Sequence, residues 1–116
     1  MKLPNGIQAI IDPRKVTDYC LCPDHDDGKH KAILFEELLG LTLDNADLLL
    51  NALKQAAIQE EADIGKLDKY GQRYVLDFDF IGPTGNAKLR SAWIIREGED
   101  VPRLVTCYII KRGEKP

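Results

Sequence analysis

The feature that most constrains the fold of this chain is a change in the spacing of its apolar residues. In the first half, apolar side chains recur every three or four residues, as they do on one face of a helix. After about residue 73 they alternate with polar side chains, as they do on a half-buried strand. Helices followed by strands indicate an α+β fold, with the helices packed on one face of an antiparallel sheet.

Three helices are expected in the first half. Asp12 and Pro13 mark the first start, because Asp caps free amide groups and Pro lacks a donor that the first turn would leave unpaired. This helix is expected to end before the next proline. The second is expected over residues 30–39, with Gly40 as its C-terminal cap. The third, over residues 44–61, begins with two aspartates spaced as in a capping box.

Three alternating stretches predict strands at residues 73–81, 88–96 and 103–110. Each is bounded by a segment containing Gly, which supplies turn conformations. In the last stretch, simple alternation places two sets on opposite faces: Leu104, Thr106, Tyr108 and Ile110 on one, and Val105, Cys107 and Ile109 on the other.

A fourth strand is expected at the edge of the sheet, at about residues 63–69. The chain is then predicted to be one domain over residues 1–116, with a helical part at about 12–61 and a sheet part at about 63–110. In this arrangement three N-terminal helices pack on one face of a four-stranded antiparallel meander.

The composition restricts the compartment and the partners. There are 19 acidic and 16 basic residues, so the net charge is −3 and contact with RNA needs a local basic patch. No apolar run approaches the roughly 20 residues that span a bilayer, and the start does not resemble a signal peptide. An odd number of cysteines, 3, argues against a disulfide framework. We therefore expect a cytoplasmic protein without membrane contact.

A cluster of soft ligands raises the question of a zinc site. Cys20, Cys22, His25 and His30 fall within eleven residues. Structural zinc sites use two ligand pairs separated by a longer loop, and the first pair is usually C-x2-C. The spacing here departs from that pattern, which favours free thiols and a polar loop. We expect three reduced cysteines, no bound metal and no cofactor; whether these four residues ever bind a metal is left to measurement.

The segment Gly28-Lys29-His30-Lys31 is a candidate site for an anion. His30 opens the second predicted helix, where free amide groups and the positive end of the dipole favour negative charge. The two lysines strengthen that field, and the histidine is a suitable acid or base for cleavage at a ribose. The alternative is a helix-cap histidine beside solvated lysines.

Longer motifs carry a resemblance to a family. They read LPN…AIIDPRKxTDY, then PDHxxGKHKA, then YGxxYVxD, then WII…PRLVTCY. This layout resembles a family of small bacterial domains of unknown function with the pattern LPNAxKAxIDPRKLTxYLLxPxHPxGxxKAxFF. The resemblance covers about residues 3 to 109, and the family is distantly similar to RNase toxins of the barnase/EndoU/colicin/RelE type. In such folds the RNA lies across the sheet.

The resemblance implies roles for particular residues. His30 and Lys31 would be the base and the phosphate-binding residue. Four strand residues would line the scissile phosphate: Arg90, Ser91, Thr106 and Tyr108. Adjacent strand residues point to opposite faces, so Arg90 and Ser91 share one site only if a bulge intervenes.

Two functions therefore compete. The first is a toxin-like, metal-independent endoribonuclease, with RNA as substrate and a small neutralising antitoxin as partner; the clustered lysines and histidine favour it. The second is a non-catalytic protein-interaction module, or an accessory protein of a toxin-antitoxin or phage-related system, which uses the edge of the sheet. The acidic composition favours the second.

Overall fold

The structure is a computed structural model that describes residues 1–24 and 29–110. Its four strands form one sheet in the order β1-β2-β3-β4, and all neighbours are antiparallel. The predicted α+β fold and antiparallel meander, with its additional edge strand, are confirmed. In chain order the elements are η1 (Gly6–Gln8), η2 (Val16–Cys20), α1 (Lys29–Leu39), η3 (Leu43–Asn45), α2 (Ala46–Gln59), β1 (Ala62–Asp68), β2 (Gly71–Ile81), β3 (Asn86–Arg96) and β4 (Arg103–Ile109).

The prediction of three packed N-terminal helices is wrong, since the described part of the chain has two long helices, α1 and α2. The first predicted helix is only η2, a π-helical turn of 5 residues. Its amide from Leu21 donates to the Val16 carbonyl at 2.9 Å, a spacing of five residues that marks a π turn. The wider turn allows Val16 and Cys20 to be fully buried on one side of a very short segment.

The second helix begins and ends as predicted, whereas the capping box before the third lies elsewhere. Gly40 follows α1 with φ 71°, the left-handed conformation that glycine adopts at a helix end. Before α2, the Thr42 amide donates to Asn45 Oδ1 at 2.8 Å, and the Asp44 amide donates to Thr42 Oγ1 at 3.3 Å. Thr42 and Asn45 therefore cap the 3-10 turn η3, in place of the two aspartates.

The simple alternation predicted for the last strand is wrong because β4 contains a bulge. Thr106 pairs with Ala92 and Leu104 pairs with Trp93, so Val105 is the additional residue. On the C-terminal side of the bulge, Tyr108 pairs with Arg90. Leu104 consequently shares the core face with Cys107 and Ile109, all of them buried, while Thr106 and Tyr108 face the other way.

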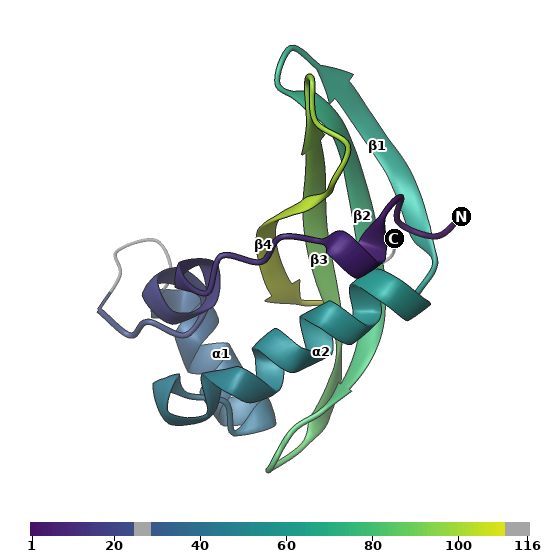
Figure 1. Cartoon of the computed structure of the whole chain (residues 1–116). Coiled ribbons are helices and arrows are strands. Elements are labelled where there is room, and N and C mark those ends of the chain that lie inside the picture. The colour runs from purple at the N-terminus through teal and green to yellow at the C-terminus, as the bar shows by residue number, and fades with distance from the viewer. Residues whose placement is uncertain (25–28, 111–116) are drawn as a thin grey trace.

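The hydrophobic core lies between the helices and one face of the sheet. Figure 1 shows α1, α2 and the N-terminal segment together on the concave side of the curved sheet. The predicted core positions Phe35 and Phe80 are buried there, as is Trp93. The opposite face carries the charged pairs Asp77–Arg90 and Asp79–Lys88. Further core members come from all layers: Leu3, Val16, Leu39, Leu49, Leu53, Leu76, Phe78 and Leu89.

The free edge of β4 is covered by the N-terminal segment. The Ile10 amide donates to the Pro102 carbonyl at 2.8 Å, and the Leu104 amide donates to the Ile10 carbonyl at 3.0 Å. Farther along the strand, the Cys20 thiol lies 3.3 Å from the Cys107 carbonyl oxygen. These contacts place η2 and α1 beside the outward-facing residues of β4. Among the helices described, none has both the length and the apolar character needed to cross a membrane.

Candidate functional site

A cavity of about 610 Å³ lies where η2 and α1 meet β4. The segment before η2 supplies one wall, the first turn of α1 supplies a lysine, and the strand supplies the bulge region. The side chains around it are rich in charge and carry one aromatic ring. They are Asp12, Arg14, Lys15, Asp18, Tyr19, Lys31, Val105 and Thr106.

Lys31 joins the helix to the strand at this cavity. Its Nζ donates to Thr106 Oγ1 at 2.8 Å. The same nitrogen lies 4.7 Å from the ring centre of Tyr19 and 5.5 Å from that of Tyr108, distances typical of cation–π contacts. An ammonium group held between two aromatic rings keeps its charge in a fixed place, which is a suitable arrangement for binding an anionic group.

Arg90 lies on the same face of the sheet, next to Tyr108. The two residues are register partners on β3 and β4. Arg90 also binds Asp77 on β2 in a two-pronged contact, with Nε and Nη2 at 2.8 and 3.0 Å from the carboxylate oxygens. Hydrogen bonding to Asp77 raises the pKa of Arg90, with a further contribution from Tyr108. The guanidinium is therefore rigid and always charged beside the Tyr108 hydroxyl.

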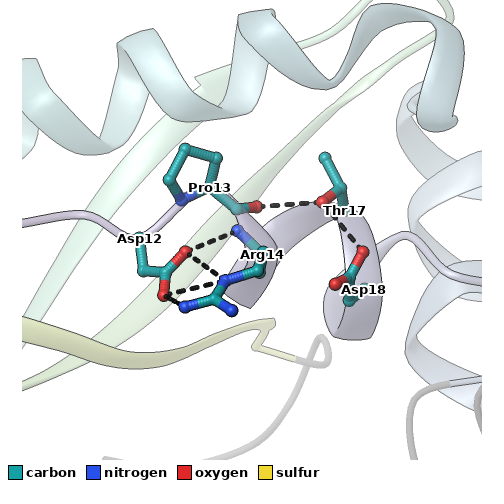
Figure 2. A network of polar contacts seen from close by, with 5 residues as sticks. All are labelled: Asp12, Pro13, Arg14, Thr17 and Asp18. Carbon is teal, nitrogen blue, oxygen red and sulfur yellow. Dashed lines mark hydrogen bonds and ion pairs between the residues drawn. The ribbon is translucent and has the colours of Figure 1, made fainter.

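The wall before η2 is held by Asp12 and Arg14 (Figure 2). The Arg14 amide donates to Asp12 Oδ1 at 3.0 Å, and Arg14 Nη2 donates to Oδ2 at 2.8 Å. The hydrogen bonds from Arg14 hold the pKa of Asp12 at about 2. Thr17 Oγ1 is within 3.2 Å of both the Pro13 carbonyl and Asp18 Oδ1. Because Asp12 already compensates Arg14, the remaining charges around the cavity are those of Lys15 and Lys31 against that of Asp18, an excess of one positive charge.

Ser91 is not at this cavity. It is fully buried on the core side of β3. Its hydroxyl donates to the Leu76 carbonyl at 3.0 Å and accepts from Trp93 Nε1 at 2.8 Å. The expectation that Arg90 and Ser91 face opposite ways is confirmed, since the bulge lies on the neighbouring strand. Ser91 satisfies a buried indole, so it has a structural role that is independent of any substrate.

His30 precedes Lys31 on α1, and its side chain is exposed. Successive helix residues point about 100° apart, so His30 and Lys31 diverge, and His30 does not line the cavity that Lys31 enters. His25 and Gly28 lie outside the described residues. Of the predicted site residues, the structure brings together Lys31, Thr106, Tyr108 and Arg90.

The cysteines lie under and beside the same strand. Cys20 and Cys107 are buried, and Cys22 is partly exposed. Burial raises the pKa of both buried thiols, which keeps them protonated and poor ligands. Within residues 1–24 and 29–110, no group of three or more His, Cys, Asp or Glu side chains is placed to hold a metal ion. Since His25 is not described, the four-ligand zinc site stays untested.

The sequence-based site did not include the side chains that come from the N-terminal segment. Asp12 was interpreted only as a helix start, and Arg14, Lys15 and Tyr19 entered only as part of the family motif. All four line the cavity. The signal was the motif IDPRKxTDY itself, since a dense run of charged and aromatic residues exceeds what a short helix start requires.

Comparisons with known proteins identify the family and the fold. A family model described as a domain of unknown function (DUF6883) matches residues 2–111. Among solved structures, the chain is similar to one chain of a contact-dependent growth inhibition toxin–immunity protein complex from Klebsiella pneumoniae 342. The TM-score is 0.68 at 19% sequence identity, over 91% of this chain and 97% of that chain. At this identity the likeness shows a shared fold. The comparison with curated proteins found no match.

Proposed function

The chain belongs to this family of domains of unknown function, and from its site we propose that it is a toxin-like, metal-independent endoribonuclease. The proposal rests on one observation above all: Lys31 Nζ is held by Thr106 Oγ1 between two tyrosine rings, in an open cavity with further cations. A phosphodiester is the anion for which cations beside stacking rings are suited. The fold shared with a chain of a toxin–immunity complex supports the toxin-like setting.

The proposed reaction needs no bound metal. The ribose 2′-hydroxyl attacks the adjacent phosphorus, a new P–O2′ bond forms and the P–O5′ bond breaks. The 2′-hydroxyl proton passes to His30, the departing 5′-oxygen takes a proton from solvent water to become a hydroxyl, and His30 returns its proton to the hydroxide so formed. The products are a 2′,3′-cyclic phosphate and a 5′-hydroxyl end.

Lys31 and Arg90 are the proposed stabilisers of the charge that develops on the phosphoryl oxygens. Thr106 holds Lys31 in place, and Tyr108 lies between the two cations. His30 is proposed as the base from outside the cavity: it neighbours Lys31 on α1 with an exposed side chain, so the ribose would have to lie at the mouth of the cavity, on the side of α1. Ser91 is left out of the proposal because its hydroxyl is buried in the core.

The test is cleavage of tRNA, mRNA and rRNA by the purified protein in the presence of EDTA, with analysis of the new ends. Wild-type protein should leave 2′,3′-cyclic phosphate. Lys31→Met should lower the rate about 10²- to 10³-fold, as expected for loss of one charge-stabilising group. His30→Ala should lower it about 10²- to 10⁴-fold, as expected for loss of a general base.

Lys54→Met is the matched control, because Lys54 is an exposed lysine on α2 away from the cavity. It should cleave at the wild-type rate. If Lys31→Met cleaves as fast as this control, the assigned centre is wrong. If wild-type protein cleaves none of the three RNA classes, the enzyme proposal fails.

A second candidate function, a protein-interaction module, has one observation in its favour. Strand β1 is an edge strand, and two of its apolar side chains are largely in solvent: Ile64 is 62% exposed and Leu67 is 72% exposed. An exposed edge can accept a strand from another chain. This function would be favoured by partner binding that a charge at Ile64 abolishes, in a protein without RNA cleavage.

A further inference from the structure

A second cavity adjoins the first along the N-terminal segment and β4. It has a volume of about 330 Å³ and shares Asp12, Lys15 and Val105 with the first cavity. The shared residues form the boundary between the two cavities. The other residues around the second cavity come from the N-terminal segment, the β1–β2 turn, the start of β2, the end of β3 and the start of β4: Ile10, Tyr70, Arg73, Ile94, Arg96, Arg103 and Leu104.

The charge of this second cavity is opposite to that of the chain as a whole. Four cations surround it, Lys15, Arg73, Arg96 and Arg103, against the single carboxylate of Asp12. Two of the arginines have carboxylate partners that orient them: Arg73 with Asp68 at 3.3 Å, and Arg103 with Glu99 at 3.1 Å.

Counting Asp68 and Glu99, the four cations face three carboxylates, in a protein whose net charge is −3. Lys15 and Arg96 form no ion pair with any described residue. These two cations are therefore the ones available to attract a negatively charged ligand into the cavity.

An aromatic ring stands at the rim of the same cavity. Tyr70 is 58% exposed, yet its backbone is fixed on both sides. Its amide donates to Asp68 Oδ1 at 2.9 Å, and its carbonyl accepts from the Glu97 amide at 3.2 Å. Lys69 Nζ lies 5.2 Å from the centre of the ring. An exposed tyrosine on such a turn, with a lysine against it and arginines nearby, is suited to stacking with an unpaired base.

We propose that this second cavity, formed by Arg96, Arg103, Arg73 and Lys15 with Tyr70 at its rim, binds the backbone and one base of single-stranded RNA beside the bond that is cleaved. Lys15 borders both cavities and guides the strand from one to the other. Along β4, Arg103 and Thr106 are three residues apart, roughly 10 Å at the rise of a strand. The inference rests on the proposed function and identifies its substrate as an extended, unpaired segment.

Binding is measured apart from cleavage with a fluorescein-labelled 2′-O-methyl oligouridylate, which has no free nucleophile. Its dissociation constant is determined by anisotropy over a series of salt concentrations. For single strands, each neutralised phosphate contributes about 0.7 to the slope of log K against log salt. Arg96→Gln should weaken binding and lower the magnitude of that slope by about 0.7, and Arg96→Gln/Lys15→Gln by about 1.4. Tyr70→Ala should weaken binding at least about 5-fold, with the salt slope unchanged.

Lys54→Gln serves as the control and should bind as wild type does. Arg96 is exposed and has no described ion-pair partner, so its substitution leaves the fold intact. In the cleavage assay, Arg96→Gln should raise KM and leave kcat within about 2-fold, because a flanking contact binds ground and transition states equally.

The outcomes separate this inference from the proposed function. RNA cleavage by wild-type protein with unchanged binding in Arg96→Gln/Lys15→Gln overturns the cavity and leaves the nuclease. Variant-sensitive binding of the oligonucleotide without any cleavage supports the cavity and overturns the nuclease. Binding of polyglutamate, with no binding of the oligonucleotide, overturns the inference and assigns the cavity to an acidic polypeptide.

Discussion

The two edge strands of the sheet, β1 and β4, are each 7 residues long, and each is interrupted once in its pairing. Their surroundings differ. Ile10 and Cys20 contact the free side of β4, whose residues are half-buried or buried. On β1, Met1 accepts from the Ala62 amide at 2.6 Å, and five successive residues beyond that point are exposed.

The difference shows how one sheet supports two kinds of surface. At β4, the covering segment brings charged and aromatic side chains over the edge, and the bulge at Val105 turns Thr106 and Tyr108 toward them. At β1, the irregularity lies between Ile64 and Leu67 and no cavity adjoins it among those described. A cavity needs side chains on more than one side, and of the two edges it is β4 that has a covering segment to supply them.

The largest expected effect comes from placing a charge on each edge. Val16→Asp places a carboxylate at a fully buried position of η2. This turn is part of the N-terminal segment that covers β4. The substitution should lower the free energy of unfolding by about 3 kcal/mol or more, because no partner is available for a buried charge. The matched change Ile64→Asp on β1 should alter it by less than about 0.5 kcal/mol. Urea denaturation of both variants measures the contrast; equal losses would mean that the two edges are equally buried in solution.

A smaller loss of stability should come from removing one backbone hydrogen bond that holds the N-terminal segment beside β4. Ile10→Pro removes the amide that donates to the Pro102 carbonyl at 2.8 Å. The preceding Ala9 has φ −52° and ψ 137°, a conformation that a following proline allows. The variant should unfold with about 1 kcal/mol less free energy than Ile10→Ala, which keeps the amide. If the two variants have the same stability, side-chain packing alone holds the N-terminal segment beside β4.

The smallest effect concerns the ion pair between Asp12 and Arg14 in the same N-terminal segment. Hydrogen bonds from Arg14 lower the pKa of Asp12 to about 2. A carboxyl whose pKa is lower in the folded state stabilises the fold above its unfolded pKa, and this contribution is lost as the pH falls through its folded pKa. The stability difference between wild type and Asp12→Asn should therefore be constant above about pH 4 and shrink toward pH 2. Thermal unfolding across that range measures it, and a difference that grows as the pH falls would contradict the assigned pair.

The sheet was predictable from local patterns because most of its strands follow the two-residue period. Along β2, Tyr74, Leu76, Phe78 and Phe80 are all buried, and they alternate with the less buried residues Val75, Asp77 and Asp79. Gly40 was predictable for a similar reason, since a glycine after a helical pattern is a recognised stop. In both cases the information lies within a few neighbouring residues.

The candidate site was predictable only in part. The resemblance to a family predicted Lys31, Thr106, Tyr108 and Arg90 as site residues, and the structure brings these four side chains together. The contact of Lys31 with Tyr19 was not anticipated, because it depends on how η2 packs beside α1. The burial of the Ser91 hydroxyl follows from its two partners, Leu76 and Trp93, the first of which is on another strand.

By itself, the sequence determined the α+β class and the order of helices before strands, since period and turn residues are local properties. Only the tertiary structure decided that Val105 is an extra residue in β4, because a bulge depends on the register with the neighbouring strand. Packing likewise decided that the N-terminal segment covers β4 and leaves β1 open. That choice depends on which apolar faces fit together across the whole chain, and it is the reason the cavity lies at one edge of the sheet.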